Sequence, residues 1–451
     1  MSSLLIENAS IVNEGQKFLG SLLIRNGLIE AIWKNTAAPQ DLKQNVDRTI
    51  DATGLLLIPG VIDDQVHFRE PGLTHKGNIY SEAKAAVAGG VTSFMEMPNT
   101  NPQTTTIEEL DKKFEIANKT SLANFSFYLG ATNNNIEEIV KIDPKKVCGV
   151  KVFMGSSTGN MLVDNIDALN KIFKHSPVLV ATHCEDETTI LASINSYKEK
   201  YGEGITFAMH PFIRSEEACY LSSSLAVKLA KQHGTRLHVL HISTKKELEL
   251  FDNSLPLEQK RITGEVCVHH LWFSENDYEK LGWRIKWNPA IKTEADRLGL
   301  IDGLINGKLD VVATDHAPHT HEEKVKPYLQ CPSGGPMVQH SLVAMLEMAK
   351  KGTFSIELVV DKMCHAPAKL FGVEKRGFIR ESYFADLVLV DPKANWTVSK
   401  ENIHYRCGWA PLEGNTFSSK VLFTIVNGNV VYDNGIFHEG IKGQALEFIR
   451  K

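Results

Sequence analysis

The stretch GVIDDQVHFREPG, residues 60–72, begins as an apolar run and ends in a cluster of polar and charged side chains. Seven further apolar runs with polar ends follow along the chain: TSFMEMP, ANFSFYLGA, GVKVFMG, VLVATHCED, RLHVLHIST, ITGEVCVHH and DVVATDHAP. Segments of helical periodicity separate them, such as IYSEAKAAVAGG, which ends at Gly89 and Gly90. Eight such strands predict an α/β fold built on a parallel, TIM-like (β/α)8 barrel. A doubly wound open sheet is the alternative, and both the strand count and the polar strand ends favour the barrel.

The two ends of the chain have a different sequence pattern, with short β-rich segments in place of alternating strands and helices. SLLIRNGLIEAIW near the N-terminus and VLFTIVNGNVVYDNG near the C-terminus each carry Asn-Gly between β-rich halves. Asn-Gly between such halves is a strong hairpin signal. We therefore expect residues 1–58 and 380–451 to form one small composite β-sandwich, and residues 59–379 to form the barrel.

The composition of the chain is ordinary for a soluble globular protein. The 451 residues are 43% hydrophobic and 23% charged, with a formal net charge of −5 and a pI near 6.4. This charge gives no reason to expect nucleic acid or an anionic membrane as a partner. The seven cysteines are scattered and include no CxxC pair, which is typical of reduced thiols. With no signal peptide evident, we expect a cytoplasmic location.

Five chemically active side chains lie at the ends of different predicted strands. They are His67, Lys151, His183, His241 and Asp315. Because all strands of a parallel barrel end on one face, these residues are expected to meet at one mouth. Three imidazoles and a carboxylate are suitable ligands for Zn²⁺. A buried neutral lysine could add carbon dioxide and become an anionic carbamate that bridges two metals. Asp315 could accept the proton of a water and return it to a leaving nitrogen.

Each of these residues also has an ordinary structural explanation. A single histidine at a strand end is usually a hydrogen-bonded structural residue. Lys151 could belong to a buried ion pair, and Asp315 could cap the following helix. Their joint placement, one at each of five strand ends, favours the site.

Several other histidines lie near the predicted mouth. We expect structural roles for His269 and His270, at the end of the seventh apolar run. Three more, His316, His319 and His321, follow Asp315. Only His319 is expected to face a substrate, and the other two are expected at the surface.

The sequence resembles the amidohydrolase superfamily, and within it the dihydroorotases of the longer-chain type. The hydantoinases and allantoinases are close relatives of this type. The motifs that carry the resemblance are HFREPG, EMPNTNP (96–102), KVFMGSSTGNM (151–161), THCED (182–186), HVLHIST (238–244), WNPAIK (287–292), ATDHAPHTHEEK (313–324), HAPAKLFG and FADLVLVDP. They span almost the whole chain. Their order is specific, although any one of them alone would be a weak signal.

The resemblance implies the reversible hydrolysis of dihydroorotate to N-carbamoyl-aspartate in pyrimidine biosynthesis. It also implies zinc, one or two ions per chain, held by His67, carboxylated Lys151, His183, His241 and Asp315. Asp315 would be the catalytic acid and base. The substrate carboxylate would be bound by Arg69, Asn99 and His319, and the ring would contact Asn288, Ser333 and Gly334. A planar guanidinium suits this carboxylate recognition.

The chain departs from the family pattern in two places. KVFMG around Lys151 resembles the hydantoinases, whereas many bacterial relatives carry Asp at a bridging site. The family also has His-x-His at the end of the first strand, where this chain has Gln65-Val66-His67. A glutamine offers only an amide oxygen, a weaker zinc ligand than imidazole. We therefore hypothesise one well-occupied zinc, with a weak or absent second ion.

Three alternative functions, one prediction of the oligomeric state and one prediction about a loop accompany this interpretation. A dihydropyrimidinase or an allantoinase would share the metals but would have less use for the carboxylate-binding residues. The third alternative is not an enzyme: a non-catalytic, dihydroorotase-like subunit that supports a transcarbamoylase. A homodimer would be ordinary for such a barrel. Residues 320–336, THEEKVKPYLQCPSGGP, are predicted to form a loop over the mouth that orders on substrate, with the HEEK charges solvated.

Overall fold

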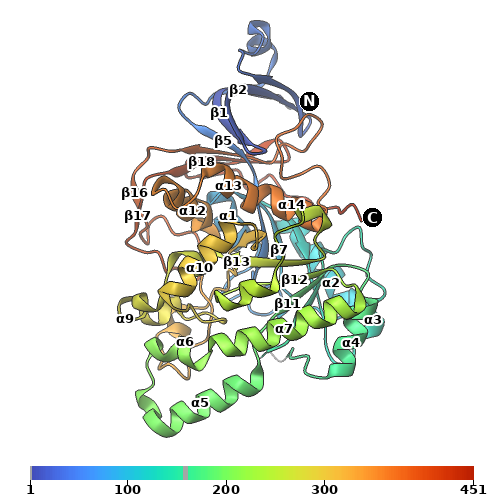
Figure 1. The fold of residues 1–451 in the computed structure, drawn as a ribbon. Coiled ribbons are helices and arrows are strands. Elements are labelled where there is room, and N and C mark those ends of the chain that lie inside the picture. The colour runs from blue at the N-terminus through green and yellow to red at the C-terminus, as the bar shows by residue number, and fades with distance from the viewer. Residues whose placement is uncertain (1–2, 156–160, 451) are drawn as a thin grey trace.

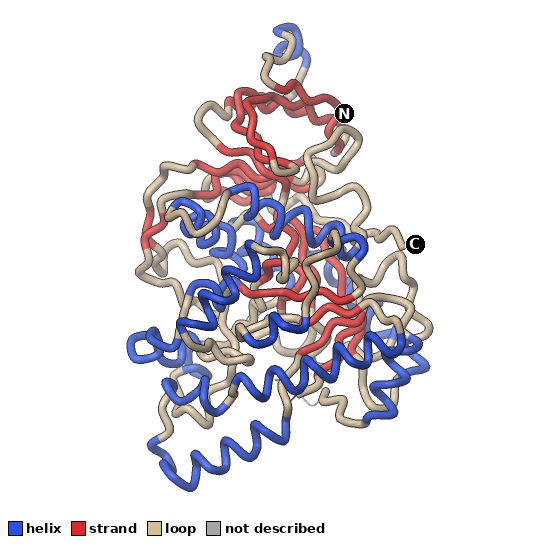
Figure 2. The backbone as a smooth tube through the Cα atoms, in the orientation of Figure 1, coloured by secondary structure: helices blue, strands red, loops and turns tan. Residues whose placement is uncertain are grey.

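The computed structural model describes residues 3–155 and 161–450. Its centre is a barrel of parallel strands, which appear as the inner red segments of Figure 2. The strands are β6 (Val61–Val66), β7 (Val91–Glu96), β8 (Asn124–Phe127), β10 (Val150–Phe153), β11 (Val180–His183), β12 (Leu237–Val239), β13 (Ile262–Cys267) and β14 (Val311–Ala313). A short strand, β9 (Leu129–Gly130), follows β8 and pairs with β10. A parallel bridge between Val66 and His316 joins the last strand end to the first. Each of the eight predicted runs contains all or nearly all of one of these strands, so the barrel prediction is confirmed.

Helices follow the strands and cover the outside of the barrel (Figure 1). The longer ones are α1 (Ile79–Ala88), α2 (Ile107–Thr120), α4 (Ile166–His175), α5 (Glu187–Tyr201), α7 (Glu216–His233), α10 (Glu294–Ile305) and α12 (Ser341–Lys350). Shorter ones are α3 (Ile136–Ile139), α6 (His210–Ile213), α8 (Val268–Trp272), α9 (Tyr278–Leu281), α11 (His321–Lys324), α13 (Ile356–Val360) and α14 (Ala366–Phe371). The sequence predicted that α1 ends at its glycine pair, and it does: Gly89 is the C-cap, and Gly90 has a φ of 85° that favours glycine.

Both ends of the chain contribute to one nine-stranded sheet, at the top of Figure 1. Its order is β20-β19-β18-β15-β5-β1-β2-β3, and β4 pairs with β1. The N-terminal strands are β1 (Ser3–Asn13), β2 (Gln16–Arg25), β3 (Leu28–Lys34), β4 (Arg48–Asp51) and β5 (Leu56–Pro59). The C-terminal ones are β15 (Leu387–Asp391), β18 (Lys420–Val426), β19 (Asn429–Asp433) and β20 (Ile436–Phe437). A separate pair is formed by β16 (Trp396–Thr397) and β17 (Thr416–Phe417).

Two features of this sheet follow from the sequence. Asn26 and Gly27, between β2 and β3, have φ values of 52° and 84°, and Asn427 and Gly428, between β18 and β19, have 50° and 76°. Two consecutive positive φ angles match the tight hairpin turns that Asn-Gly predicts. The sheet is continuous because β15 pairs antiparallel with β5 across most of the sequence. The domain boundaries at residues 58 and 380 stay a prediction.

A buried ion pair ties α2 to the end of β7. The Nζ atom of Lys113 lies 2.5 Å from Oε2 of Glu96, and neither side chain is exposed. Lys113 also donates to the carbonyl oxygen of Met97 at 3.1 Å. We expect Lys113→Met to lower the free energy of unfolding by about 3–5 kcal/mol, because it leaves the Glu96 carboxylate buried without a counter-charge. Urea unfolding measures this change.

The neighbouring lysine provides a matched control for that measurement. Lys112 also pairs with glutamates, Glu108 and Glu109, but half of its side chain is exposed. Because exposed pairs contribute little, Lys112→Met should change the unfolding free energy by less than about 1 kcal/mol. Equal effects of the two substitutions would contradict the role given to the buried pair.

Two further properties of the described residues bear on function. All seven cysteines are buried and free, so no disulfide constrains the fold. None of the helices in residues 3–155 and 161–450 is both long enough and apolar enough to span a bilayer.

Candidate functional site

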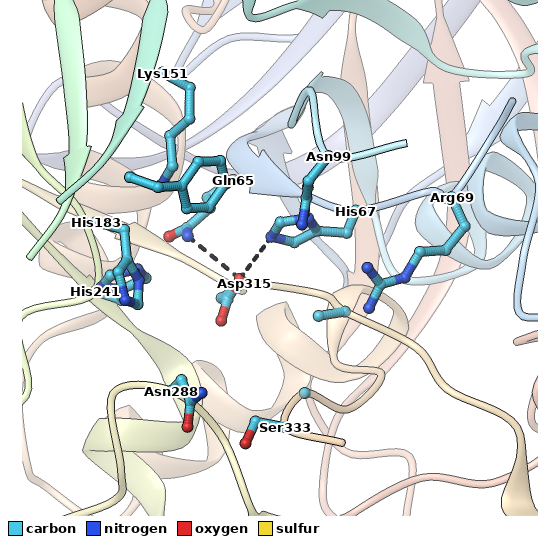
Figure 3. Close-up of a pocket in the computed structure, with 13 residues that line it drawn as sticks. Gln65, His67, Arg69, Asn99, Lys151, His183, His241, Asn288, Asp315 and Ser333 are labelled. Carbon is cyan, nitrogen blue, oxygen red and sulfur yellow. Dashed lines mark hydrogen bonds and ion pairs between the residues drawn. The ribbon is translucent and has the colours of Figure 1, made fainter. Parts of the chain in front are cut away.

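The strand ends converge on one pocket (Figure 3). Its thirteen lining residues are Gln65, His67, Arg69, Asn99, Lys151, Phe153, His183, His241, Asn288, Asp315, Ala317, Ser333 and Gly334. Every predicted site residue is among them except His319, which contacts the lining residue Arg69. Phe153 and Ala317 were not predicted as site residues, because they have no reactive group to mark them. Residues 156–160 of the KVFMGSSTGNM motif lie outside the described residues.

His67 and Asp315 face each other on one side of the pocket. Nδ1 of His67 lies 2.7 Å from Oδ1 of Asn99, which can only accept, so Nδ1 carries the hydrogen. That leaves Nε2 bare, 3.1 Å from Oδ1 of Asp315. Burial lowers the pKa of His67, which favours the neutral ring. Two atoms that each present a lone pair lie this close only with a proton or a cation between them. Two ligand atoms on a tetrahedral zinc ion lie about 3.3 Å apart, which is close to this distance.

His183 and His241 form a second pair of nitrogen donors. Nδ1 of His183 lies 2.9 Å from Nε2 of His241, and both rings are buried. Burial lowers the pKa of both histidines, and their mutual repulsion contributes for His241. The opposite nitrogen of His183, Nε2, lies 3.1 Å from Oε2 of Glu185. A carboxylate that contacts one ring nitrogen leaves the other free for a metal, as is usual for histidine ligands.

Glu185 is a residue whose role the sequence analysis did not assign, although it lies two positions after His183. Arg214 donates to its Oε2 at 2.5 Å. Burial acts to raise the pKa of Glu185, but the Arg214 charge and the bond to His183 outweigh it and lower that pKa to about 2. Glu185 is therefore an anion that fixes the His183 ring.

Lys151 reaches this pocket from β10. It is 1% exposed, and no ion pair within the described residues includes it. Burial lowers the pKa of Lys151 to about 8. The buried-ion-pair explanation is therefore wrong for Lys151, and its lowered pKa makes more of the neutral amine, the form that can add carbon dioxide, available than an exposed lysine would have.

Gln65 occupies the position where the family pattern has a histidine. Its Nε2 lies 3.2 Å from Oδ1 of Asp315, so the amide group donates to the carboxylate that would hold a metal (Figure 3). Its Oε1 accepts from Sγ of Cys267 at 3.8 Å. In this orientation Gln65 presents hydrogens, and not a lone pair, to the space between His67 and Asp315.

A group of hydrogen-bond donors lies beside these residues, around His319. Nζ of Lys76 lies 3.1 Å from Nδ1 of His319, so the ammonium group makes Nδ1 an acceptor. The hydrogen is then on Nε2, which lies 3.1 Å from the carbonyl oxygen of Ser333 and 3.2 Å from Nη2 of Arg69. The N–H of His319 donates to the Ser333 carbonyl oxygen and cannot bond to Nη2 of Arg69, so this end of the guanidinium suits an anionic acceptor. Lys76 was not identified from the sequence.

Buried lysines hold the loop that follows α11. Nζ of Lys324 donates to the carbonyl oxygens of Lys286, Pro332 and Gly334 at 2.7–3.3 Å. The prediction of a solvated HEEK segment is wrong for Lys324, which is fully buried, because the carbonyl groups of the loop replace water around its Nζ. The pocket beneath has a cavity volume of about 30 Å³. That is room for a water or an ion. The ordering of residues 320–336 on substrate stays a prediction.

Among the other histidines, one prediction is wrong. His316 is fully buried, although we expected it at the surface. Its Nε2 lies 2.9 Å from Oε2 of Glu82 on α1, and its Nδ1 accepts from the backbone of Met337. These partners are remote in sequence, so the local DHAPH pattern did not reveal them. His321 is exposed as predicted.

Two buried groups of metal-ligating side chains lie beyond the predicted set. One contains Asp64 on β6, His238 on β12 and Glu265 on β13, and all three are buried. Burial opposes the charge on His238, but hydrogen bonds to Asp64 and Glu265 outweigh it and raise its pKa to about 9. The imidazolium thus supplies the positive charge between the two carboxylates. Oε1 of Glu265 accepts from the backbone N–H of His241 at 2.9 Å, which supports that residue at its φ of 40°.

The other group contains Cys267, His269 and His270. The His269 ring stacks on Trp287, with centroids 4.3 Å apart. Nε2 of His270 lies 3.2 Å from the carbonyl oxygen of Pro289. These packing contacts agree with the structural roles expected for both histidines.

Comparison with known proteins places this geometry in a family. The model of the amidohydrolase family matches residues 56–431. The chain is 33% identical to the dihydroorotase of Methanosarcina mazei, over 99% of this chain and 98% of that protein. It is 30% identical to the dihydroorotase of Aquifex aeolicus, over 96% of this chain and 100% of that protein. Among solved structures, the L-hydantoinase (dihydropyrimidinase) from Arthrobacter aurescens has a TM-score of 0.92 at 27% identity, covering 99% of this chain and 100% of that one. The chain belongs to the amidohydrolase family.

Proposed function

We propose that this chain is a dihydroorotase, a zinc-dependent hydrolase that interconverts dihydroorotate and N-carbamoyl-aspartate. The observation that carries the proposal is the set of donors formed by Arg69 and His319 beside Asp315. Arg69 is buried, and its Nε donates to the carbonyl oxygen of Pro318, which fixes the guanidinium. A fixed guanidinium next to an imidazole N–H suits a substrate that carries a carboxylate beside its cyclic amide. The dihydroorotases of other organisms match the chain over nearly its whole length.

The donor set of the pocket fits a divalent metal. Nδ1 of His183 and Nε2 of His241 face each other at 2.9 Å, and Lys151 as a carbamate would add an anionic oxygen. His67 and Asp315 would serve a second ion, with Gln65 in place of the usual third donor. A bound zinc would polarise the amide carbonyl of the substrate and activate water.

The chain's own residues would bind, orient and exchange a proton with the substrate. Arg69 and His319, with Asn99, would hold the carboxylate and so fix the ring against Asp315. Asp315 would accept the proton of the attacking water and deliver it to the ring nitrogen that leaves. Oδ1 of Asn288 has no hydrogen-bond partner among the described residues, so it can accept from a ring N–H.

The decisive test is turnover of L-dihydroorotate by the purified protein supplied with zinc and bicarbonate, measured beside hydantoin, dihydrouracil and allantoin. Dihydroorotate should be the preferred substrate. Preference for hydantoin or dihydrouracil would support the dihydropyrimidinase alternative, the activity named for two solved structures of similar fold. No turnover of any substrate in folded, metal-loaded protein would support the non-catalytic alternative. A homodimer, a transcarbamoylase partner and a cytoplasmic location stay predictions.

Lys76 should affect substrate binding more than the chemical step. Lys76→Met removes the donor that places the hydrogen of His319 on Nε2, and the ring can then turn or change tautomer. We expect KM for dihydroorotate to rise about tenfold, the effect of about one charge-assisted hydrogen bond, while kcat changes less than about threefold. Steady-state kinetics measure both constants.

Lys76→Arg is the matched variant for this prediction, since it keeps a cationic donor near Nδ1 of His319. It should restore most of the loss in KM. An equal loss in both variants would show that Lys76 acts through its ion pair with Glu323, at 3.0 Å, and not through the imidazole.

A further inference from the structure

A second pocket lies at the opposite end of the barrel from the active site. We call it the basal pocket, and its cavity volume is about 210 Å³. Its walls are the last residues of α4 and α7 and the residues just before β11, β12 and β13. Strands of a parallel barrel carry their chemistry at the other end, so this pocket has no part in the proposed reaction.

The basal pocket is lined by basic side chains and by no acidic one. The five are Lys174, His233, Arg236, Arg261 and Arg450. No ion pair within residues 3–155 and 161–450 includes any of the three arginines. The chain as a whole has a net charge of −5, so this local excess of positive charge runs against the average of the surface.

Backbone carbonyl groups hold the three arginines in place. Arg450 donates to Pro144, Phe371, Val147 and Cys148 through its three nitrogens. Arg261 uses Nε and Nη2 for the carbonyl oxygen of Gly234, and Arg236 uses Nη2 for that of Leu370. These bonds leave Nε and Nη1 of Arg236 unused. They also leave Nη1 of Arg261 unused. Fixed guanidinium groups with donors to spare are pre-organised for an anion.

The three guanidinium groups also repel one another. Burial lowers the pKa of Arg236, and the charge of Arg261 lowers it further. Burial lowers the pKa of Arg450 to about 10, with a contribution from Arg236. Carbonyl oxygens carry only partial negative charge and offset this repulsion in part, whereas an anion would relieve it directly.

We propose that the basal pocket binds a small phosphate-bearing anion. Two guanidinium groups with free donors, together with the Lys174 ammonium, match the several acceptor oxygens and the charge of a phosphate group. The volume is smaller than the roughly 300 Å³ of typical sites for larger ligands, so the ligand is a phosphate group with little attached. This site is independent of the proposed dihydroorotase activity.

The test is calorimetric titration of the zinc-loaded protein with inorganic phosphate, at constant ionic strength. We expect saturable binding whose Kd rises at least about tenfold in the double variant Arg236→Gln/Arg261→Gln. The control is Lys17→Gln/Arg25→Gln, which removes two charges from the N-terminal sheet and should leave the Kd unchanged. Any phosphate that binds at the metal site would bind equally to both double variants. An unchanged Kd in Arg236→Gln/Arg261→Gln would therefore overturn the proposal.

Two further measurements keep the proposal falsifiable. If the double variant does not fold, Lys174→Gln replaces it, because Lys174 is exposed and makes no hydrogen bond among those identified in the described residues. Its Kd for phosphate should rise about threefold, and an unchanged Kd would count against the pocket. Titration with malonate distinguishes the ligand classes: equal or tighter binding of this dicarboxylate would overturn the assignment to phosphate.

Discussion

Asp315→Asn is expected to lower kcat for dihydroorotate by about 10³- to 10⁴-fold, the usual contribution of a general acid and base. The substitution preserves shape. Nε2 of Gln65 and Nε2 of His67 both contact Oδ1 of Asp315, so an asparagine oxygen at this position still accepts from Gln65 but cannot donate to His67. The negative charge and the ability to exchange a proton are lost. Steady-state kinetics on the folded, metal-loaded variant measure the effect.

A buried aspartate outside the pocket provides the control. Asp310 is 3% exposed and lies 2.7 Å from Nζ of Lys260. Asp310→Asn should reduce stability but leave kcat within about threefold, at a temperature where the protein stays folded. If Asp315→Asn kept more than about a tenth of the wild-type kcat, Asp315 would not be the proton-exchanging group.

Gln65→His is expected to raise the zinc content from about one to about two ions per chain after dialysis. In the structure, the Gln65 amide donates to Oδ1 of Asp315 and so occupies the direction in which a metal would bind. An imidazole would replace that donor with a lone pair and would complete a set with His67 and Asp315. Elemental analysis of the purified proteins measures the ratio directly and does not depend on activity.

The control for this gain is Gln65→Asn, which keeps an amide but shortens the side chain. Its zinc content should stay at about one ion per chain. Two tightly held zinc ions in the wild-type protein would refute the hypothesis that Gln65 weakens the second site. Equal zinc content in all three proteins would lead to the same conclusion.

The barrel could be predicted from the sequence because polar residues follow each apolar strand at its C-terminal end. An apolar run followed by a polar cluster fixes both the direction of a parallel strand and the face on which its last side chains lie. His67, Lys151 and Asp315 therefore meet in one pocket as predicted. Their roles as ligands or as the acid and base remain proposals that the variants above test.

Contacts between remote segments could not be read from local pattern. Lys76 and His319 are 243 positions apart, yet their side chains bond and fix a tautomer. Lys324 looked like one charge in a solvated run, but the carbonyl groups that replace its water come from the loop after α11. His316 was misplaced for the same reason, since its partner Glu82 lies on α1.

The pairing of β15 with β5 has a consequence for biosynthesis. During translation, β1 to β5 leave the ribosome first, but the partner of β5 is not made until more than three hundred residues later. At about 5–20 residues per second, the hydrogen-bonding edge of β5 stays open for roughly 20–60 s. An exposed strand edge invites pairing with other chains. A nascent chain of this protein is therefore expected to depend on chaperones, or on early docking of its N-terminal strands, more than a chain whose domains are each completed in turn.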